Sequence, residues 1–533
     1  MAARFEPSIF ALAALVFVFL VLDRGCSAPT YSSRLVHRFS DELKGRRGSG
    51  NGEAWPERGS MEYSRKLLNI DTGRRKLKLK SRYRLLFPVE GSGTWTLGNE
   101  FGWLHYTWIK IGHADVSFLV ALDSGSDLLW VPCDCINCAP LSSSYYSSLD
   151  RDLNEYNPSG SKSSRPLPCG HPLCELGSNC TTSIDPCPYT VNYYSDGMSS
   201  SGVLVQDTLH LASIGDGTSN TSIQALVVLG CGRNQSGDFL DGVAPDGLMG
   251  LGLGNISVLN VLASSGLTQN SFSLCFNDDG SGTINFGDQG FAKQHSTAFL
   301  PLDGKYSTFI IGVEACCTGS YCLQHTSFEA LVDSGTSFTY FPDDVYKKVV
   351  EEFDRQVNAT RYNNYPSWEY CYESSLQDFP KIPSIKLLFP SNNIFVIHDP
   401  ILRVYEQKGI VRFCLAVQKT DEDIGTIGQN FMIGYRMVFD KEKMMLGWSC
   451  FNCSDIGNGG AEPLNSSPSS SPTSTVPPNE QVPPNEQWHA HGGHAVGPAI
   501  AGKPSIASTG LLQPSLCVFV RSLLLLYLLP FAL

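Results

Sequence analysis

Two stretches of the sequence share one pattern: residues 119–126 read LVALDSGS, and residues 329–336 read EALVDSGT. Each is an apolar run, as in a buried β-strand, that ends in Asp-Ser-Gly and then Ser or Thr. A single Asp-Ser-Gly is an ordinary turn sequence. Its recurrence behind two similar apolar runs predicts instead two related halves, which contribute one carboxylate each, Asp123 and Asp333, to a shared site.

The residue types of the two turns suit a pair of catalytic carboxylates. Gly125 and Gly335 let the backbone come close and point N–H groups at the acid. Four hydroxyl side chains can bond across the turns or donate to the carboxylates: Ser124, Ser126, Ser334 and Thr336. Two carboxylates held close together cannot both ionise easily, so we expect them to share a proton and to act as general acid and base.

The surrounding sequence, from about residue 101 to residue 450, predicts an all-β body. Short apolar runs rich in strand-forming residues alternate with Gly, Asn, Asp and Pro. An apolar-glycine element follows each turn later in the chain, at 247–250 and at 426–428. One helix is expected after Pro342, where apolar residues recur every four positions behind two aspartates.

With these motifs, residues 101–450 resemble the pepsin-like aspartic peptidases, and among them the plant nepenthesin-like group. The resemblance implies a bilobal all-β fold with the active cleft between the lobes, and no metal or cofactor. It also implies a β-hairpin flap at residues 193–197, which read YYSDG, with Tyr194 at the tip followed by Ser195 and Asp196. Trp130 matches the residue that hydrogen-bonds the flap tyrosine in this family.

The sequence departs from the family pattern at three places. Both turns read Asp-Ser-Gly where Asp-Thr-Gly is typical, Ser195 stands where Gly is usual, and Thr426 stands where Ile or Leu is expected. None of these changes removes a group that carries a proton, so we expect activity to survive.

Several features predict a secreted protein. Residues 1–28 read as a signal peptide, with an apolar run behind Arg4. Of the 18 cysteines, 16 remain when Cys26 and Cys517 in the end segments are set aside, an even number that favours disulfides over a zinc site at residues 133–138. The sequence has seven N-glycosylation sequons: Asn179, Asn220, Asn234, Asn255, Asn358, Asn452 and Asn465.

Charge divides the chain into a leader and a body. Residues 29–100 hold 15 Lys/Arg and 8 Asp/Glu, a net charge of +7, whereas residues 101–533 hold 22 and 41, a net charge of −19. A basic leader ahead of an acidic body predicts a prosegment docked by charge, and the acidic body speaks against a nucleic-acid partner. The two lobes are expected at 101–300, with a cysteine-rich insertion, and at 301–453.

The C-terminal end predicts a surface anchor. Residues 454–510 are rich in Pro and Ser and read as a flexible stalk, and residues 511–533 form a terminal apolar tail. Small residues, a spacer and a terminal apolar tail are typical of a signal for a glycosylphosphatidylinositol (GPI) anchor, for which Ser505 is the favoured attachment residue. A spanning helix and a soluble secreted protein remain open alternatives.

The sequence thus predicts a monomeric, secreted aspartic endopeptidase that acts on polypeptides at acidic pH. An inactive inhibitor or binding protein on the same scaffold is the main alternative, although such proteins usually lose an aspartate or the flap tyrosine. The glycine run at 250–254 could indicate a nucleotide-binding enzyme, but no βαβ unit follows it.

Overall fold

The computed structural model describes part of the leader and most of the body, within one compact unit that spans Ala28–Leu464. The described residues are 30–38, 40, 57, 59–78, 105–113, 116–142, 152–174, 180–193, 198–212, 222–240, 242, 244–277, 281–302, 305–365, 367–406 and 409–450. The predicted signal peptide, stalk and tail lie outside them. Within these ranges, no helix is both long enough and apolar enough to span a membrane.

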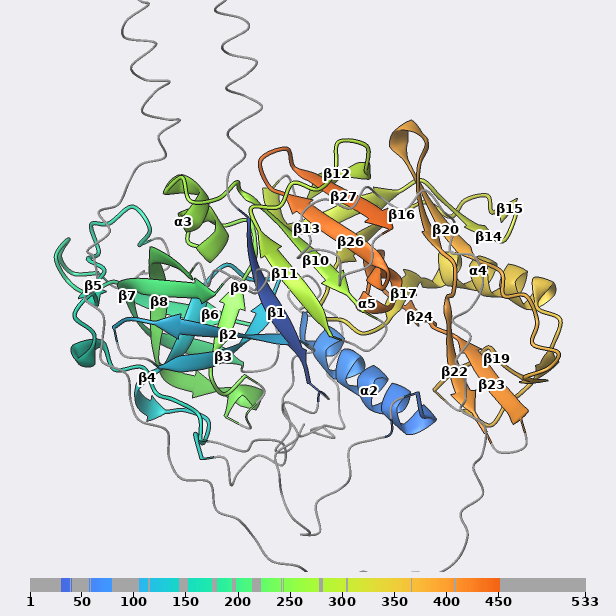
Figure 1. Ribbon diagram of the computed structural model, residues 1–533, viewed down its shortest axis with the longest axis horizontal. Coiled ribbons are helices and arrows are strands. Elements are labelled where there is room, and N and C mark those ends of the chain that lie inside the picture. The colour runs from blue at the N-terminus through green and yellow to red at the C-terminus, as the bar shows by residue number, and fades with distance from the viewer. Residues whose placement is uncertain are drawn as a thin grey trace, which may run out of the picture. The chain divides into compact units, whose positions relative to one another are not determined.

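The fold consists mostly of β-strands (Figure 1). The leader forms β1 (Tyr31–His37) and α2 (Met61–Lys78). The first half of the body contains β2 (His105–Ile111), β3 (Ser117–Asp123), β4 (Leu129–Asn137), η2 (Pro158–Gly160), β5 (Arg165–Pro166), β6 (Pro188–Asn192), β7 (Ser199–Ala212), β8 (Ser222–Ser236), η3 (Gly237–Phe239), β9 (Leu248–Gly250), α3 (Val258–Ser264), β10 (Ser271–Phe276), β11 (Gly282–Phe286) and β12 (His295–Leu302).

The second half has the same character. Its elements are β13 (Lys305–Val313), β14 (Ala315–Thr318), β15 (Tyr321–Cys322), β16 (Phe328–Val332), β17 (Thr339–Pro342), α4 (Asp343–Gln356), β18 (Thr360–Arg361), β19 (Cys371–Ser375), β20 (Ile385–Phe389), η4 (Pro390–Asn392), β21 (Asn393–Ile397), β22 (Ile401–Tyr405), β23 (Ile410–Leu415), β24 (Val417–Thr420), β25 (Ile424–Ile427), α5 (Gln429–Met432), β26 (Tyr435–Asp440) and β27 (Met445–Cys450). The helix expected after Pro342 is confirmed as α4, which buries Val345, Val349 and Phe353.

The two halves repeat one strand arrangement around the two Asp-Ser-Gly turns. In the first half, β3 runs parallel to β9, and β4 pairs with β8 in parallel and with β9 in antiparallel fashion. In the second half, β16 runs parallel to β25, and β17 pairs with β24 in parallel and with β25 in antiparallel fashion. The predicted all-β fold of two related halves is therefore confirmed.

The strands that lead to the turns differ in how far they are covered: β3 is buried on both faces, whereas β16 is buried on one face and exposes Glu329 on the other. Residues 118–122 of β3 are all buried, and in β16 Phe328, Ala330 and Val332 are buried. Strands in parallel pairs that are covered on both sides read as nearly continuous apolar runs. The pattern that marks the two motifs in the sequence is thus the pattern of a central strand.

The leader supplies a strand to the body, which the sequence did not predict. Strand β1 pairs antiparallel with β11, from Tyr31 opposite Phe286 to Leu35 opposite Gly282 (Figure 1). It also pairs with β2, where Val36 lies opposite Tyr106. Both Leu35 and Val36 are buried. Backbone hydrogen bonds and apolar contacts therefore hold the leader, and the docking by charge that the sequence suggests stays a prediction.

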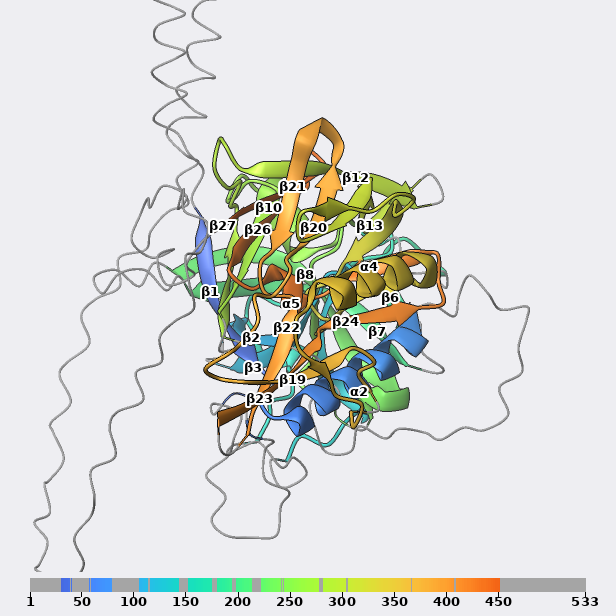
Figure 2. The same ribbon diagram turned by 90° about the vertical axis from the view of Figure 1, so that its right-hand side faces the viewer.

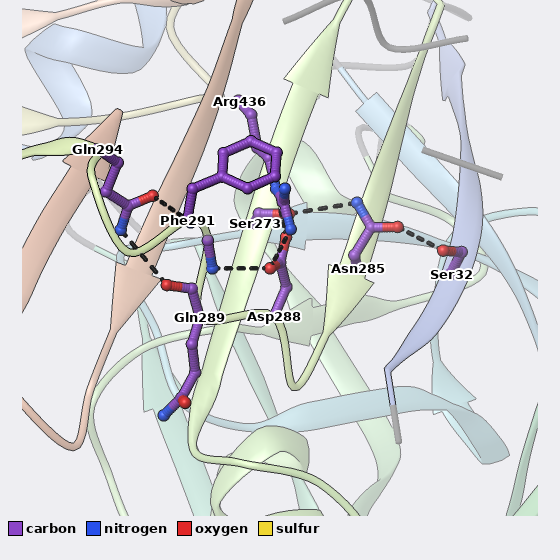
Figure 3. A network of polar contacts seen from close by, with 9 residues as sticks. Ser32, Ser273, Asn285, Asp288, Gln289, Phe291, Gln294 and Arg436 are labelled. Atoms are coloured by element: carbon purple, nitrogen blue, oxygen red, sulfur yellow. Dashed lines mark hydrogen bonds and ion pairs between the residues drawn. The ribbon is translucent and has the colours of Figure 1, made fainter. Parts of the chain in front are cut away.

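A chain of polar contacts ties β1 across this sheet (Figure 3). The hydroxyl of Ser32 donates to the Asn285 side chain, whose Nδ2 donates to Ser273 Oγ at 3.2 Å. Ser273 donates in turn to Asp288, which accepts a hydrogen bond from Arg436 Nε at 2.7 Å. Ser273 and Asn285 are fully buried, so the leader strand completes a buried network that ends in an ion pair on β26.

Helix α2 of the leader packs on the second half of the body. Leu67 and Leu68 are buried in one cluster with Phe338 and Trp368. In Figures 1 and 2, α2 lies beside the small sheet that contains β19, β22 and β23, and these strands contribute to the same cluster. The helix thus covers the segment that directly follows the second Asp-Ser-Gly turn.

The cysteines are paired less completely than expected. The described disulfides are Cys133–Cys231, Cys135–Cys138, Cys169–Cys180, Cys174–Cys187, Cys317–Cys322 and Cys371–Cys414. Cys316 and Cys450 carry free thiols. Cys317 lies directly opposite Cys322 in the β14–β15 hairpin, whereas its neighbour Cys316 is on the other face of the strand and is buried.

Candidate active site

The first Asp-Ser-Gly turn begins where β3 ends. Asp123 is 5% exposed, and its Oδ1 accepts a hydrogen bond of 3.2 Å from the backbone N–H of Gly125. Its backbone carbonyl accepts another, of 2.8 Å, from the N–H of Leu251, just after β9. The strand, the glycine and the neighbouring parallel strand together fix the position of the carboxylate.

The second turn repeats this geometry behind β16. Asp333 is 1% exposed, and its Oδ1 accepts a hydrogen bond of 2.9 Å from the N–H of Gly335. Its Oδ2 accepts a hydrogen bond of 2.7 Å from Thr336 Oγ1, the donor that the sequence nominated. The backbone N–H of Asp333 donates to the carbonyl of Ile427 at 3.1 Å. In the first half the backbone of the aspartate accepts instead, because the Asp123 carbonyl takes the hydrogen bond from the Leu251 N–H.

The two serines that follow the aspartates are buried but do not join the turns. Neither Ser124 nor Ser334 makes a side-chain hydrogen bond to any described residue, so the bond expected between them is not formed in this structure. The turns are held from behind by backbone bonds instead: Gly252 N–H donates to the Ser126 carbonyl at 2.8 Å, and Gln429 N–H donates to the Thr336 carbonyl at 2.7 Å.

The glycine run after β9 packs directly on the first turn. A Cβ atom on Gly252 or Gly254 would lie 2.4 or 2.5 Å from the Asp127 side chain, and the Gly254 N–H donates to Asp127 Oδ1 at 2.6 Å. These glycines are therefore required for close approach to the first Asp-Ser-Gly turn. The run has a local structural reason and gives no support to a nucleotide-binding site.

The tyrosine bonded to Trp130 is not the one that the sequence suggested. Trp130 Nε1 donates to the hydroxyl of Tyr193 at 2.7 Å, and both rings pack edge-on against Phe239. Burial and, after it, the negative charge of Asp123 raise the pKa of the Tyr193 phenol, so this side chain lies within electrostatic reach of the first carboxylate. Because an indole has one donor, Trp130 cannot donate to Tyr194 as well.

The flap hairpin itself is formed as expected up to its last pair. Strand β6 pairs with β7 as far as Asn192 opposite Ser199, and the Tyr193 N–H donates to the Met198 carbonyl at 3.0 Å. Residues 194–197 lie outside the described residues, so the roles of Tyr194, Ser195 and Asp196 stay predictions. The register of the hairpin, which the sequence YYSDG does not reveal, decides between the two tyrosines.

The leader reaches the second turn through a residue that sequence reasoning missed. Asp71 of α2 is 1% exposed, and its two carboxylate oxygens accept hydrogen bonds of 2.8 Å each from the N–H groups of Ser337 and Phe338. These two residues directly follow Thr336 of the second Asp-Ser-Gly turn. No local pattern marks an aspartate inside a basic helix as such a contact.

A second buried acid supports the first strand. Asp246 accepts hydrogen bonds from the N–H groups of Leu119 at 2.7 Å and of Asn154 at 3.3 Å. Burial raises its pKa to about 7, against the smaller opposing effect of these bonds. It therefore fixes the beginning of the segment that delivers Asp123.

The glycosylation and anchor residues predicted from the sequence lie partly within and partly outside the described residues. Three sequon asparagines lie on described, exposed positions: Asn234, Asn255 and Asn358. Four lie outside the described residues, as does the anchor candidate Ser505: Asn179, Asn220, Asn452 and Asn465. The cysteines once open to a zinc interpretation, at 133–138, are all in disulfides.

The fold, in which each of two related halves carries one Asp-Ser-Gly turn, is the scaffold of the aspartic peptidases. Comparison with known proteins agrees. The family model described as "Xylanase inhibitor N-terminal" matches residues 105–288, and "Xylanase inhibitor C-terminal" matches residues 320–450.

Curated relatives match nearly the whole chain. The chain is 52% identical over 513 residues to aspartic proteinase-like protein 1 of Arabidopsis thaliana, covering 94% of this chain and 95% of that protein. It is 40% identical over 456 residues to aspartyl protease family protein 1 of Arabidopsis thaliana, covering 85% and 86%. It is 26% identical over 376 residues to nepenthesin-1 of Nepenthes gracilis, covering 65% and 77%.

The chain therefore belongs to the plant family of pepsin-like aspartic peptidases, and the resemblance inferred from its motifs is confirmed. Among solved structures, soybean basic 7S globulin matches with a TM-score of 0.48 and 19% identity, covering 66% of this chain and 93% of that one.

Proposed function

We propose that this protein is an aspartic endopeptidase whose catalytic residues are Asp123 and Asp333. The observation that carries the proposal is the repetition of one turn: each aspartate ends a buried strand and accepts a hydrogen bond from the glycine two residues on. Both acids, both glycines and the hydroxyl residues of both turns are present. No proton-carrying group that the reaction needs is missing.

The mechanism is general acid–base catalysis without a covalent intermediate. The ionised aspartate takes a proton from a water molecule, which attacks the scissile carbonyl carbon. The protonated aspartate polarises the carbonyl oxygen, and a proton then passes to the leaving amine as the peptide bond breaks. Because the pair needs one proton and one charge, activity is expected at acidic pH.

The test is hydrolysis of an unspecific protein substrate across the acidic range by the purified mature enzyme. Asp123→Asn and Asp333→Asn should each lower kcat by about a thousandfold or more while circular dichroism and Tm remain those of the parent. A pepstatin-type transition-state analogue should inhibit. A well-folded single variant with activity near that of the parent would refute the dyad.

A binding protein on the same scaffold is the second candidate, favoured by the description of the matching family models as xylanase inhibitor domains. The two functions separate in one experiment. If the purified protein hydrolyses no substrate but inhibits a xylanase, and the Asp123→Asn variant inhibits it equally well, the protein is a binding protein. The intact turns favour the peptidase.

The leader, residues 29–100, serves as a prosegment in this proposal. The contact of Asp71 with the segment after Thr336 supports this role, because it occupies backbone donors beside a catalytic turn. Acid exposure should shorten the purified chain by removal of residues up to about 85–101. Mature material that still begins near residue 29 by N-terminal sequencing would contradict it.

Secretion and attachment to the outer cell surface complete the proposal. The apolar residues 511–533, the small residues near Ser505 and the Pro/Ser-rich stalk support a GPI anchor. Phosphatidylinositol-specific phospholipase C should release the protein from intact cells. Protein that stays in the membrane fraction and keeps the peptide 511–533 by mass spectrometry would exclude the anchor.

A further inference from the structure

A buried lysine from the second half reaches the back of the first catalytic turn. Lys441 follows β26 and is 7% exposed. Its Nζ donates to the carbonyl oxygen of Gly252 at 2.6 Å and to Ser257 Oγ at 3.2 Å. Lysine is almost never buried without a specific partner, so this position needs an explanation beyond solubility.

The carbonyl that accepts from Lys441 belongs to the peptide segment that holds the catalytic turn. The N–H of the same Gly252 donates to the carbonyl of Ser126 at 2.8 Å, and the N–H of the preceding Leu251 donates to the carbonyl of Asp123 at 2.8 Å. Two consecutive residues therefore hold both ends of the turn from Asp123 to Ser126, and Lys441 holds these residues from the other side.

The segment that carries Lys441 is itself fixed. Its backbone N–H donates to the carbonyl of Asn270 at 3.0 Å, and the N–H groups of Glu442 and Lys443 both donate to Asp440 Oδ1. A lysine on a rigid turn can transmit the position of one half of the protein to the other. A lysine on a loose loop could not do so.

Burial sets the charge state of the ammonium group. Desolvation lowers the pKa of Lys441 to about 8, and the negative charge of Asp127 acts in the opposite direction. At the acidic pH expected for the reaction, Lys441 is therefore fully charged. A buried charge costs free energy unless hydrogen bonds stabilise it, as those to Gly252 and Ser257 do here.

We infer that Lys441 is a positioning residue that holds the Asp123 turn in its catalytic geometry through Gly252. The inference rests on the proposed peptidase function. Lys441 does not touch the reacting atoms. It holds Gly252, and the N–H groups of Leu251 and Gly252 in turn hold the carbonyls of Asp123 and Ser126. Loss of its hydrogen bonds should displace the turn without removing any group that takes part in the chemistry.

The test compares three variants of the full chain. Lys441→Met keeps the length of the side chain but removes the charge and the donors, and it should lower kcat about ten- to hundredfold with little change in KM. Lys441→Arg keeps charge and donors and should retain kcat within about threefold of the parent. Lys443→Met is the matched control, since Lys443 is exposed and pairs with Asp440, and should leave kcat unchanged.

A second readout does not depend on turnover. Amide hydrogen exchange should be faster at residues 123–128 and 251–252 in Lys441→Met than in the parent or in Lys443→Met. The exchange measurement separates the role of Lys441 from the proposed peptidase function, because it reports on the geometry of the turn even if the protein cleaves no substrate. If Lys441→Met fails to fold, the neutral Lys441→Gln replaces it in both measurements.

Three results would overturn the inference. Unchanged kcat and exchange in Lys441→Met would show that the turn does not need the lysine. Equal losses of kcat in Lys441→Met and Lys441→Arg would show a packing role rather than hydrogen bonding. A lower Tm with unchanged exchange at residues 123–128 would show that the lysine contributes to stability alone.

Discussion

The Asp71 carboxylate is a charged contact between leader and body, which makes Asp71→Asn an informative substitution. Each hydrogen bond from a backbone N–H to a carboxylate contributes about 1.5–3 kcal/mol, and Asp71 accepts two, from Ser337 and Phe338. The asparagine side chain keeps one neutral acceptor, which contributes about 1 kcal/mol. The net loss is then about 2–5 kcal/mol of leader docking.

This loss predicts a large change in the rate of activation. At about 1.4 kcal/mol per factor of ten, the population with α2 displaced should rise about thirty- to several thousandfold. The assay follows the shortening of the full chain by gel and mass spectrometry at one mildly acidic pH. Glu62→Gln is the matched control, because Glu62 lies on the same helix and forms an exposed ion pair with Arg65.

The result that refutes the reasoning is a conversion rate for Asp71→Asn equal to that of the parent and of Glu62→Gln. It would show that the apolar contacts of Leu67 and Leu68 hold α2 without help from the carboxylate. To exclude a slower protease as the cause, the same conversion is measured with mature parent enzyme added in trans.

Two further substitutions test the supports of the first turn. Trp130→Phe removes the hydrogen bond to Tyr193, which contributes about 1 kcal/mol, and should lower kcat/KM about fivefold. Trp448→Phe is the control, because it removes a hydrogen bond to the Ile394 carbonyl in the second half and should lower Tm but not kcat/KM. Because burial raises the pKa of Asp246 to about 7, the folded protein keeps a proton on this carboxyl that the unfolded chain releases above about pH 4. The free energy of unfolding should therefore fall by up to about 4 kcal/mol as pH rises from 4 to 7. Asp246→Asn should flatten this slope in thermal unfolding curves, and an equal slope in parent and variant would assign it to other groups.

The features that the sequence predicted well are those encoded within a short segment. The apolar run and Asp-Ser-Gly of each turn specify a buried strand and its end, and the spacing of Val345, Val349 and Phe353 specifies one face of a helix. The parallel pairing of β3 with β9 and of β16 with β25 was not predicted, because each pair joins strands far apart in the chain.

The features that it missed depend on residues far apart in the chain. Strand β1 has only three apolar residues, and its partner β11 lies about 250 residues later, so its pairing has no local signature. The same holds for Asp71 with Ser337, and for Lys441 with Gly252. The choice of Tyr193 over Tyr194 as the partner of Trp130 turns on a hairpin register that two adjacent, chemically identical side chains cannot reveal.

The two leader elements are held to the body by different contacts, and this difference orders the steps of activation. Helix α2 depends on the two hydrogen bonds to the Asp71 carboxylate and on the contacts of Leu67 and Leu68, whereas β1 has a ladder of backbone pairs with β11 and buries Leu35 and Val36. We therefore expect α2 to leave first while β1 stays paired. Hydrogen exchange at mildly acidic pH should quicken in residues 61–78 before residues 31–37, and more so in Asp71→Asn. Simultaneous loss of protection in both segments would show instead that the leader unfolds as one unit.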